Sequence, residues 1–193
     1  MTSRFSAFVF RNRKFFSTGV LIFLIVLKIC LRGTTSLSLI IIGAAIIGAG
    51  IAFRMYSASY LWGKHIVTEI EAEFFCTSGP FAYMKNPLYF GNFIIGLGAC
   101  VAFNEWYGYT VFLAEYAFRY SVVTSYEEKY MQDKFGDDYA EYKAQTRRFL
   151  PKLKAYKGGK KTTPNYKLGA WSEKYHVLIL LTSLIIFYIF FVE

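Results

Sequence analysis

The sequence predicts an all-α protein, a polytopic membrane helix bundle of about five transmembrane helices with a cytoplasmic N-terminus and cytoplasmic amphipathic helices. Hydrophobic residues make up 55% of the 193 residues and aromatic residues 20%, which is too apolar for an ordinary soluble domain. The apolar residues form five runs of roughly the length of a short membrane span. The basic residues gather in alternate connecting segments, as they do in multi-pass proteins. A chain of this length suits a single domain, residues 1–193.

The expected spans are 15–31, 37–53, 88–103, 106–123 and 176–192. In the first span, Lys28 lies near the end and is expected to extend its stem so that the ammonium group reaches the interface. The second span is rich in small residues, including Gly43, Gly48 and Gly50, so we expect it to pack closely against a neighbouring helix.

The polar segments between these spans carry the remaining structure. Residues 54–78 are expected to lie at the membrane interface, where His65 and the glutamates of 69–73 suit a solvated edge better than a metal site. The fourth span continues as a helix that stops at Gly136, and an amphipathic helix follows and ends at 149–151. The loop 152–174 holds seven lysines and is expected to favour anionic lipid headgroups.

Topology follows from the basic residues. Segments 1–14, 54–87 and 124–175 hold 4, 3 and 12 Lys or Arg, whereas the other turns hold only Arg32. By the positive-inside rule the three rich segments are cytoplasmic, and we expect a multi-pass protein of a bacterial cytoplasmic membrane. Nucleic acid is not an expected partner, because the basic residues lie between apolar runs without a zinc-finger or RNP-like motif. The three cysteines show no Cys-x-x-Cys spacing, so we expect neither a metal site nor a disulfide.

Candidate chemistry gathers on the cytoplasmic side. Asn86 suits the N-cap and Pro87 the first position of a helix, whose free N–H groups can bind an anionic group; the alternative is a simple, well-capped membrane helix. Glu127-Glu128 follows the fourth span on the same side, where a solvated pair is the alternative to a functional one. Glu115 and Arg119 are four residues apart inside that span, so they either form a structural ion pair or line a wet cavity.

Taken in order, these features resemble a known family. The elements are Gly79-Pro80-Phe81-x-Tyr83-x-Lys85-Asn86-Pro87-x-Tyr89-x-Gly91, Glu127-Glu128, Phe135-Gly136-x-x-Tyr139-x-x-Tyr142 and Arg148-Phe149-Leu150-Pro151. They are similar to the integral membrane methyltransferases that include isoprenylcysteine carboxyl methyltransferase and the phospholipid N-methyltransferases. The prenylcysteine enzymes carry Arg-His-Pro where this chain has Lys-Asn-Pro, which is closer to the phospholipid enzymes. The resemblance covers a core of about 55–152, between a helix hairpin at 1–54 and a basic loop with an extra span at 153–193.

The resemblance implies S-adenosylmethionine as methyl donor, bound at the cytoplasmic face, and a membrane-embedded lipid or isoprenoid-type acceptor. The cofactor-binding residues that it implies are Gly79, Tyr83, Asn86, Pro87, Tyr89, Gly91, Gly96, Gly98, Glu127 and Glu128. Glu127 and Glu128 are also the expected catalytic residues, with Glu115 and Arg119 as further candidates, and no metal ion is expected.

Two other functions are compatible with the same sequence. One is an NADPH-dependent reductase of sterols or polyprenols, whose family also has a Pro-x-Tyr-x-Gly element near a cytoplasmic helix start. The other is a non-enzymatic membrane protein whose basic loop binds anionic lipid or a protein partner.

Overall fold

The computed structural model describes residues 4–31, 34–61, 75–159 and 161–175, together with six residues between 177 and 189. The expected interfacial residues 62–74, with His65, and most of the fifth span lie outside them. All regular elements in the described ranges are helices, as predicted. They are α1 (Arg4–Cys30), α2 (Leu37–Ser59), the 3-10 helix η1 (Gly79–Ala82), α3 (Pro87–Phe103), α4 (Trp106–Gln145) and α5 (Tyr166–Ser172).

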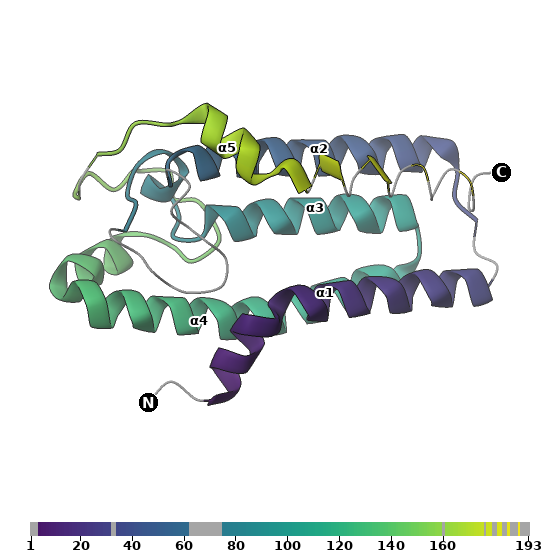
Figure 1. Ribbon diagram of the computed structural model, residues 1–193, viewed down its shortest axis with the longest axis horizontal. Helices are drawn as coiled ribbons and strands as arrows, with labels where there is room; N and C mark the ends of the chain where they lie inside the picture. Colours follow the sequence, from purple (N-terminus) through teal and green to yellow (C-terminus); the bar gives the residue numbers. More distant parts are fainter. Residues whose placement is uncertain are drawn as a thin grey trace.

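The four long helices run along the long axis of the molecule (Figure 1). α2 packs against α3, α1 packs against α4, and α5 lies on α2. The turn between α3 and α4 lies at one end of the bundle, while η1 and the bend of α4 lie at the other (Figure 1). The start of α3 and the bend of α4 therefore lie at the same end.

Glycines hold α2 and α3 close together, as the small residues of the second run predicted. A Cβ on Gly98 would lie 2.7 Å from the carbonyl oxygen of Gly43, and one on Gly50 would lie 3.1 Å from the carbonyl oxygen of Gly91. At these points the two backbones are in contact, which leaves no room for a side chain.

One helix in the described part of the chain, α2, is both long and apolar enough to cross a membrane. α3 is also apolar but has 17 residues. The membrane character that the composition predicts is therefore carried most clearly by the closely packed α2–α3 pair.

Several predicted boundaries are wrong. α2 continues to Ser59, six residues beyond the expected end of the second span. Gly136 breaks the helical path of α4 with φ 53°, as predicted, but the amphipathic helix after it ends at Gln145 and not at 149–151. The reason is tertiary, because Arg147 pairs with Met84 and its carbonyl accepts the N–H of Lys85 at 2.8 Å.

The expectation for Lys28 is also wrong, because its side chain is fully buried. Its Nζ donates to the Phe103 carbonyl at 2.6 Å and to Thr35 Oγ1 at 2.9 Å, and it lies 3.3 Å from Glu105 Oε1. The ammonium group thus satisfies a carbonyl at the C-terminal end of α3, where a positive charge is favourable.

Candidate functional site

The opening motif forms a tight turn that leads into α3. Gly79 has φ +58° and lies against the Tyr60 ring, so only glycine fits there without strain. After η1, the chain runs beside the segment that follows α4. The Tyr83 carbonyl accepts the N–H of Lys152 at 3.0 Å, and the Ala82 carbonyl accepts that of Tyr156 at 2.8 Å. These paired segments form one wall at the end of the bundle.

Asn86 and Pro87 occupy the N-cap and the first helical position of α3, as predicted. The Asn86 side chain, however, makes no capping bond to the helix. Its Nδ2 donates instead to the Arg148 carbonyl at 3.0 Å, a partner 62 residues away. The start of α3 is therefore joined directly to the segment that carries Arg148.

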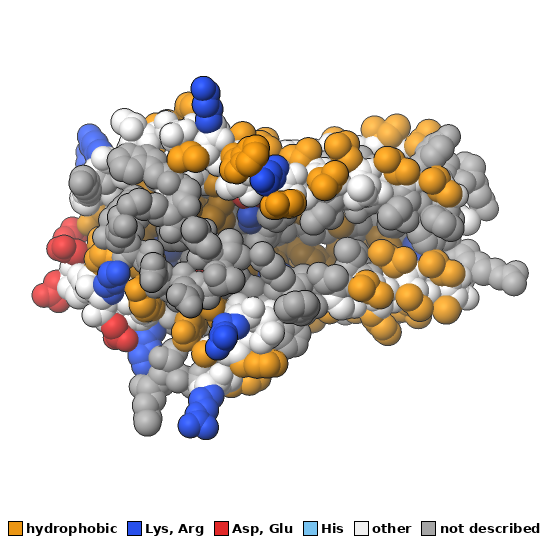
Figure 2. Space-filling view, viewed as in Figure 1, with side chains coloured by type: hydrophobic (Ala, Val, Ile, Leu, Met, Phe, Trp, Pro, Cys, Tyr) orange, Lys and Arg blue, Asp and Glu red, His pale blue; other side chains and the backbone are white. Residues whose placement is uncertain are grey.

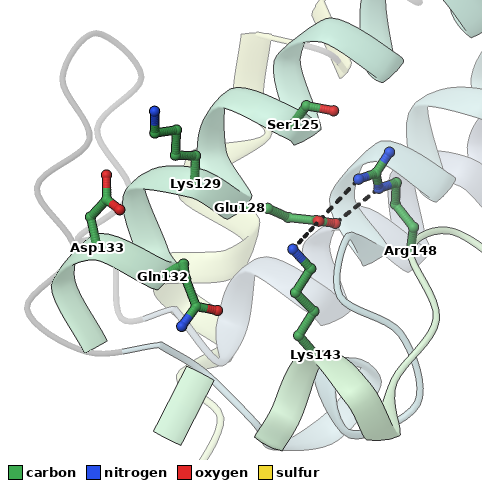
Figure 3. A pocket seen from close by; sticks show the side chains of 7 residues that line it. All are labelled: Ser125, Glu128, Lys129, Gln132, Asp133, Lys143 and Arg148. Atoms are coloured by element: carbon green, nitrogen blue, oxygen red, sulfur yellow. Dashed lines mark hydrogen bonds and ion pairs between the residues drawn. The ribbon is translucent and has the colours of Figure 1, made fainter. Parts of the chain in front are cut away.

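Glu128 is the centre of a charged cluster, with only 4% of its surface exposed. Arg148 donates to both carboxylate oxygens, at 2.9 and 3.0 Å, while Lys85 lies 3.1 Å and Lys143 3.3 Å from them. Figure 3 shows the Arg148 and Lys143 side chains converging on this carboxylate. We call Lys85, Glu128, Lys143 and Arg148 the Glu128 cluster.

Charge in the cluster changes the pKa of its members. Burial alone raises the pKa of the Glu128 carboxyl, but the Arg148 hydrogen bonds and the Lys85 charge outweigh it and lower the pKa to about 2. Burial lowers the pKa of Lys85, against the opposing effect of Glu128. The Glu128 hydrogen bond raises the pKa of Arg148. Three cations surround one carboxylate, so the cluster carries an excess of positive charge.

Glu127 has a different environment, because it accepts a short hydrogen bond from the Tyr89 hydroxyl on α3. The Tyr89 ring packs against that of Tyr120, with centroids 4.6 Å apart. The Tyr89 carbonyl accepts the Tyr116 hydroxyl at 2.8 Å. The first turn of α3 is thus fixed to α4 by both its side chain and its backbone.

Glu115 and Arg119 form the ion pair that their spacing predicts. Nε and Nη2 of Arg119 donate to the two carboxylate oxygens of Glu115. The Arg119 guanidinium also lies over the Tyr120 ring, 4.2 Å from its centroid. This pair therefore lies next to Tyr120, whose ring packs against Tyr89, the residue that donates to Glu127.

Two cavities open beside the wall. The first, of about 350 Å³, is lined by residues of polar and charged types; they are Ser125, Glu128, Lys129, Gln132, Asp133, Lys143 and Arg148 (Figure 3). The second, of about 520 Å³, is mostly apolar, and its lining residues are Phe53, Tyr56, Gly79, Pro80, Ala82, Tyr83, Met84, Phe90, Pro151 and Ala155. Both volumes lie in the range of about 300–1,000 Å³ that small-molecule sites occupy.

Three glycines of the predicted cofactor set lie farther along α3 and face other helices. A Cβ on Gly91 would overlap the Arg54 side chain on α2, and one on Gly96 would overlap the Phe112 ring on α4. Gly98 contacts the α2 backbone. Helix packing accounts for glycine at all three positions.

Several residues at this end were not singled out from the sequence. Lys85 and Arg148 lie inside the quoted motifs, and their positions next to Asn86 and Phe149 are the signal that could have drawn attention to them. Arg54 pairs with Glu173, 119 residues away, with Nε–Oε2 2.8 Å and Nη2–Oε1 2.9 Å. Sequence spacing gives no indication of such a pair.

Comparison with known proteins agrees with the motifs. The family model described as phospholipid methyltransferase matches residues 38–138, just over half of the chain. A curated relative, the cobalt-zinc-cadmium resistance protein CzcN of Cupriavidus metallidurans, is 33% identical over an alignment of 108 residues that covers 54% of this chain. The match spans 45% of the length of that relative. No solved structure matches.

The metal resistance in the name of the relative is a property of that protein. Within the ranges that the structure describes, no three His, Cys, Asp or Glu residues come together in a way that could hold a metal ion. The family match runs from α2 through Gly136 and includes the start of α3 and the Glu127-Glu128 pair of α4. The chain belongs to the phospholipid methyltransferase family, whose members are membrane methyltransferases.

Proposed function

We propose that this protein transfers a methyl group from S-adenosylmethionine to a membrane-embedded lipid or isoprenoid-type acceptor. The observation that carries the proposal is the contact between two distant motif elements. Tyr89 at the start of α3 binds Glu127, and the neighbouring Lys85 lies 3.1 Å from Glu128. When bound, the cofactor would supply an activated methyl group, and the protein would supply binding, orientation and exclusion of water.

The residues at this end of the bundle fit such a cofactor. In the Glu128 cluster, Lys143 and Arg148 keep 43% and 39% of their side-chain surface exposed, so they can attract a carboxylate. The apolar cavity is lined by four aromatic rings, which suit the flat adenine base and the positively charged sulfur of the cofactor. The rings belong to Phe53, Tyr56, Tyr83 and Phe90. The wall is formed by residues 82–86 and 147–152, and it contributes residues to both cavities.

The two glutamates are assigned different roles. A carboxyl with a pKa of about 2 is a poor general base near neutral pH, so Glu128 serves to hold Lys85, Lys143 and Arg148 in place. Glu127 is assigned to attract the positively charged groups of the cofactor, its ammonium or sulfonium, and to accept a proton from an amine acceptor; a carboxylate acceptor would need no base. The proposed set of cofactor-binding residues therefore leaves out Gly91, Gly96 and Gly98, which act through helix packing.

The acceptor is proposed to enter from the bilayer. Large hydrophobic side chains on the long helices have 47% or more of their surface exposed, as expected of surfaces that face lipid; they include Ile22, Phe23, Val26 and Ile29 on α1, Ile41 and Ile42 on α2, and Leu113 and Phe118 on α4. On the face shown in Figure 2, hydrophobic side chains gather on the half away from the bend of α4, and the clearly visible acidic side chains lie at the end where α4 bends. That end is the proposed cytoplasmic side of a multi-pass protein.

Binding of labelled S-adenosylmethionine to the purified protein in detergent tests the proposal. We expect saturable binding by the wild-type protein. Glu127→Gln should bind at least about tenfold more weakly, because the carboxylate that attracts the positively charged groups of the cofactor is lost. Glu141→Gln, an exposed position on the same helix, is the matched control and should bind as the wild type does. Absence of binding by the wild type, or stabilisation against heat by NADPH in place of S-adenosylmethionine, would contradict the proposal.

A further inference from the structure

We propose that Arg54 is a positioning residue for the methyltransferase site, and that Glu173 holds it in place. This inference rests on the proposed function. Arg54 lies on α2, and 9% of its surface is exposed. It does not line either cavity, so it would act through the side chains that it contacts.

Arg54 divides its donors between two sides. Nε and Nη2 bind the two oxygens of Glu173, which is 2% exposed. Nη1 points the other way and donates to Asn92 Oδ1 at 2.5 Å and to the Leu88 carbonyl at 3.1 Å. A rigid planar fork can make both sets of bonds at once, whereas a lysine ammonium is a single point charge.

The bond from Arg54 determines which way the Asn92 amide points. Because a guanidinium can only donate, Asn92 must turn its oxygen towards Arg54 and its Nδ2 away from it. Nδ2 then donates to the Tyr120 hydroxyl on α4 at 2.6 Å. Arg54 therefore fixes Tyr120 through Asn92.

Tyr120 in turn supports the site. Its ring packs against the Tyr89 ring, and the Tyr89 hydroxyl donates to Glu127. With Tyr120 fixed on one side and Glu127 on the other, Tyr89 has little freedom to rotate. The path from Arg54 to Glu127 consists only of direct contacts between buried or half-buried side chains.

Glu173 brings in a part of the chain that lies beyond the family match at 38–138. This segment is attached to α2 at two further points. The Ser59 carbonyl accepts the N–H of Asn165 at 2.8 Å, and Gly169 lies against the Met55 backbone. The C-terminal segment is thus part of the support of the site, with Glu173 as the residue that makes the connection.

A double-mutant cycle distinguishes positioning from a general loss of stability. Arg54→Lys keeps the charge opposite Glu173 but removes the fork, and Tyr120→Phe removes the acceptor of Asn92. We expect each change to weaken S-adenosylmethionine binding by about tenfold, and the double variant to bind no more weakly than either single variant. Additive losses would overturn the proposal, because they would mean that Arg54 does not act through Tyr120.

Lys28→Met is the matched control, because Lys28 is also a buried cation but lies at the other end of the bundle. It should lower the unfolding temperature and leave the dissociation constant unchanged. If it weakened binding as much as Arg54→Lys at an equal loss of stability, the effect of Arg54 would be explained by stability alone and the proposal would fail.

A measurement without ligand separates this inference from the proposed function. In protein labelled with ¹⁵N-asparagine, the Asn92 side-chain amide should be protected from exchange, since its partners are buried; its signal is identified by its loss in Asn92→Leu. Protection should disappear in Arg54→Lys and persist in Lys28→Met. Retained protection in Arg54→Lys would refute the positioning role even if the wild type binds S-adenosylmethionine, whereas a wild type that does not bind would refute only the proposed function.

Discussion

Glu127 and Glu128 show how neighbouring carboxylates acquire different chemistry. Successive residues of a helix point about 100° apart, so the two side chains face different partners. Glu128 turns towards three cations, while Glu127 turns towards the hydroxyl of Tyr89. The pair is therefore better described as two groups with separate partners than as a unit.

The low pKa of Glu128 predicts a specific dependence of stability on pH. Relative to an ordinary value of 4.5, a folded-state pKa of about 2 corresponds to about 3 kcal/mol of stability at neutral pH. Because the folded-state value is the lower one, this contribution is present above pH 4.5 and is lost as the pH falls towards 2. The unfolding temperature of Glu128→Gln should lie well below that of the wild type at about pH 7. The difference between the two temperatures should be smaller at about pH 3.

Glu141→Gln again serves as the control for this measurement. Its carboxylate is exposed and accepts a bond from Gln145. Its unfolding temperature should follow that of the wild type over the whole pH range. A difference between Glu128→Gln and the wild type that stayed constant down to about pH 3 would show that the Glu128 cluster does not stabilise the folded state through its charge.

Buried cations were the residues that sequence patterns predicted least well. Lys28 was expected at an interface and Arg54 in a polar connecting segment, yet both are buried and paired. Their acidic partners are 77 and 119 residues away. A buried charge is tolerated only when a partner offsets its desolvation, and nothing local in a sequence shows whether a distant partner will be present.

At the scale of helices, contact between α2 and α3 depends on glycine. Gly98→Ala would place a Cβ 2.7 Å from the Gly43 oxygen and 2.8 Å from the Ile47 nitrogen. Since both are backbone atoms, the helices would have to separate, and we expect a loss of about 1–3 kcal/mol. Unfolding of the purified protein by heat measures this loss.

Gly48→Ala provides the comparison on the opposite face of α2. Nothing lies within 4 Å of a Cβ added there, and alanine favours helix by about 0.5–1 kcal/mol over glycine. Gly48→Ala should therefore be neutral or slightly stabilising. Equal losses for the two variants would mean that close approach of α2 and α3 is not what requires glycine at Gly98.

Helix starts were easier to predict than helix ends. Asn86-Pro87 marks the start of α3 and Gly136 the bend of α4, because proline and glycine restrict or release the backbone locally. The end of α4 depends on the pairing of Arg147 with Met84, and α2 is extended by contacts with the C-terminal segment. Such contacts between distant segments are not encoded in local periodicity.

For the molecule as a whole, the separation of charge from apolar surface defines an expected orientation in the membrane. The Glu128 cluster and the acidic residues near the bend of α4 share one end, whereas the turn between α1 and α2 lies at the other (Figures 1 and 2). From the positive-inside rule, we expect the first end to lie in the cytoplasm.

An exposed cysteine introduced at either end tests this orientation, with the buried Cys76 and Cys100 left in place. Ser36 and Asp137 are both exposed, and Ser36 makes no side-chain capping bond to α2, so Ser36→Cys and Asp137→Cys should fold normally. The exposed Cys30 is replaced by serine in both variants. In sealed vesicles that keep the orientation of the cell, a membrane-impermeant thiol reagent should label the cysteine at 36 directly and the one at 137 only after the vesicles are opened. Labelling of both positions without opening would mean that α1 to α4 do not hold the two ends on opposite sides of the membrane. Direct labelling at 137, with labelling at 36 only after opening, would invert the proposed topology and move the Glu128 cluster to the outer face.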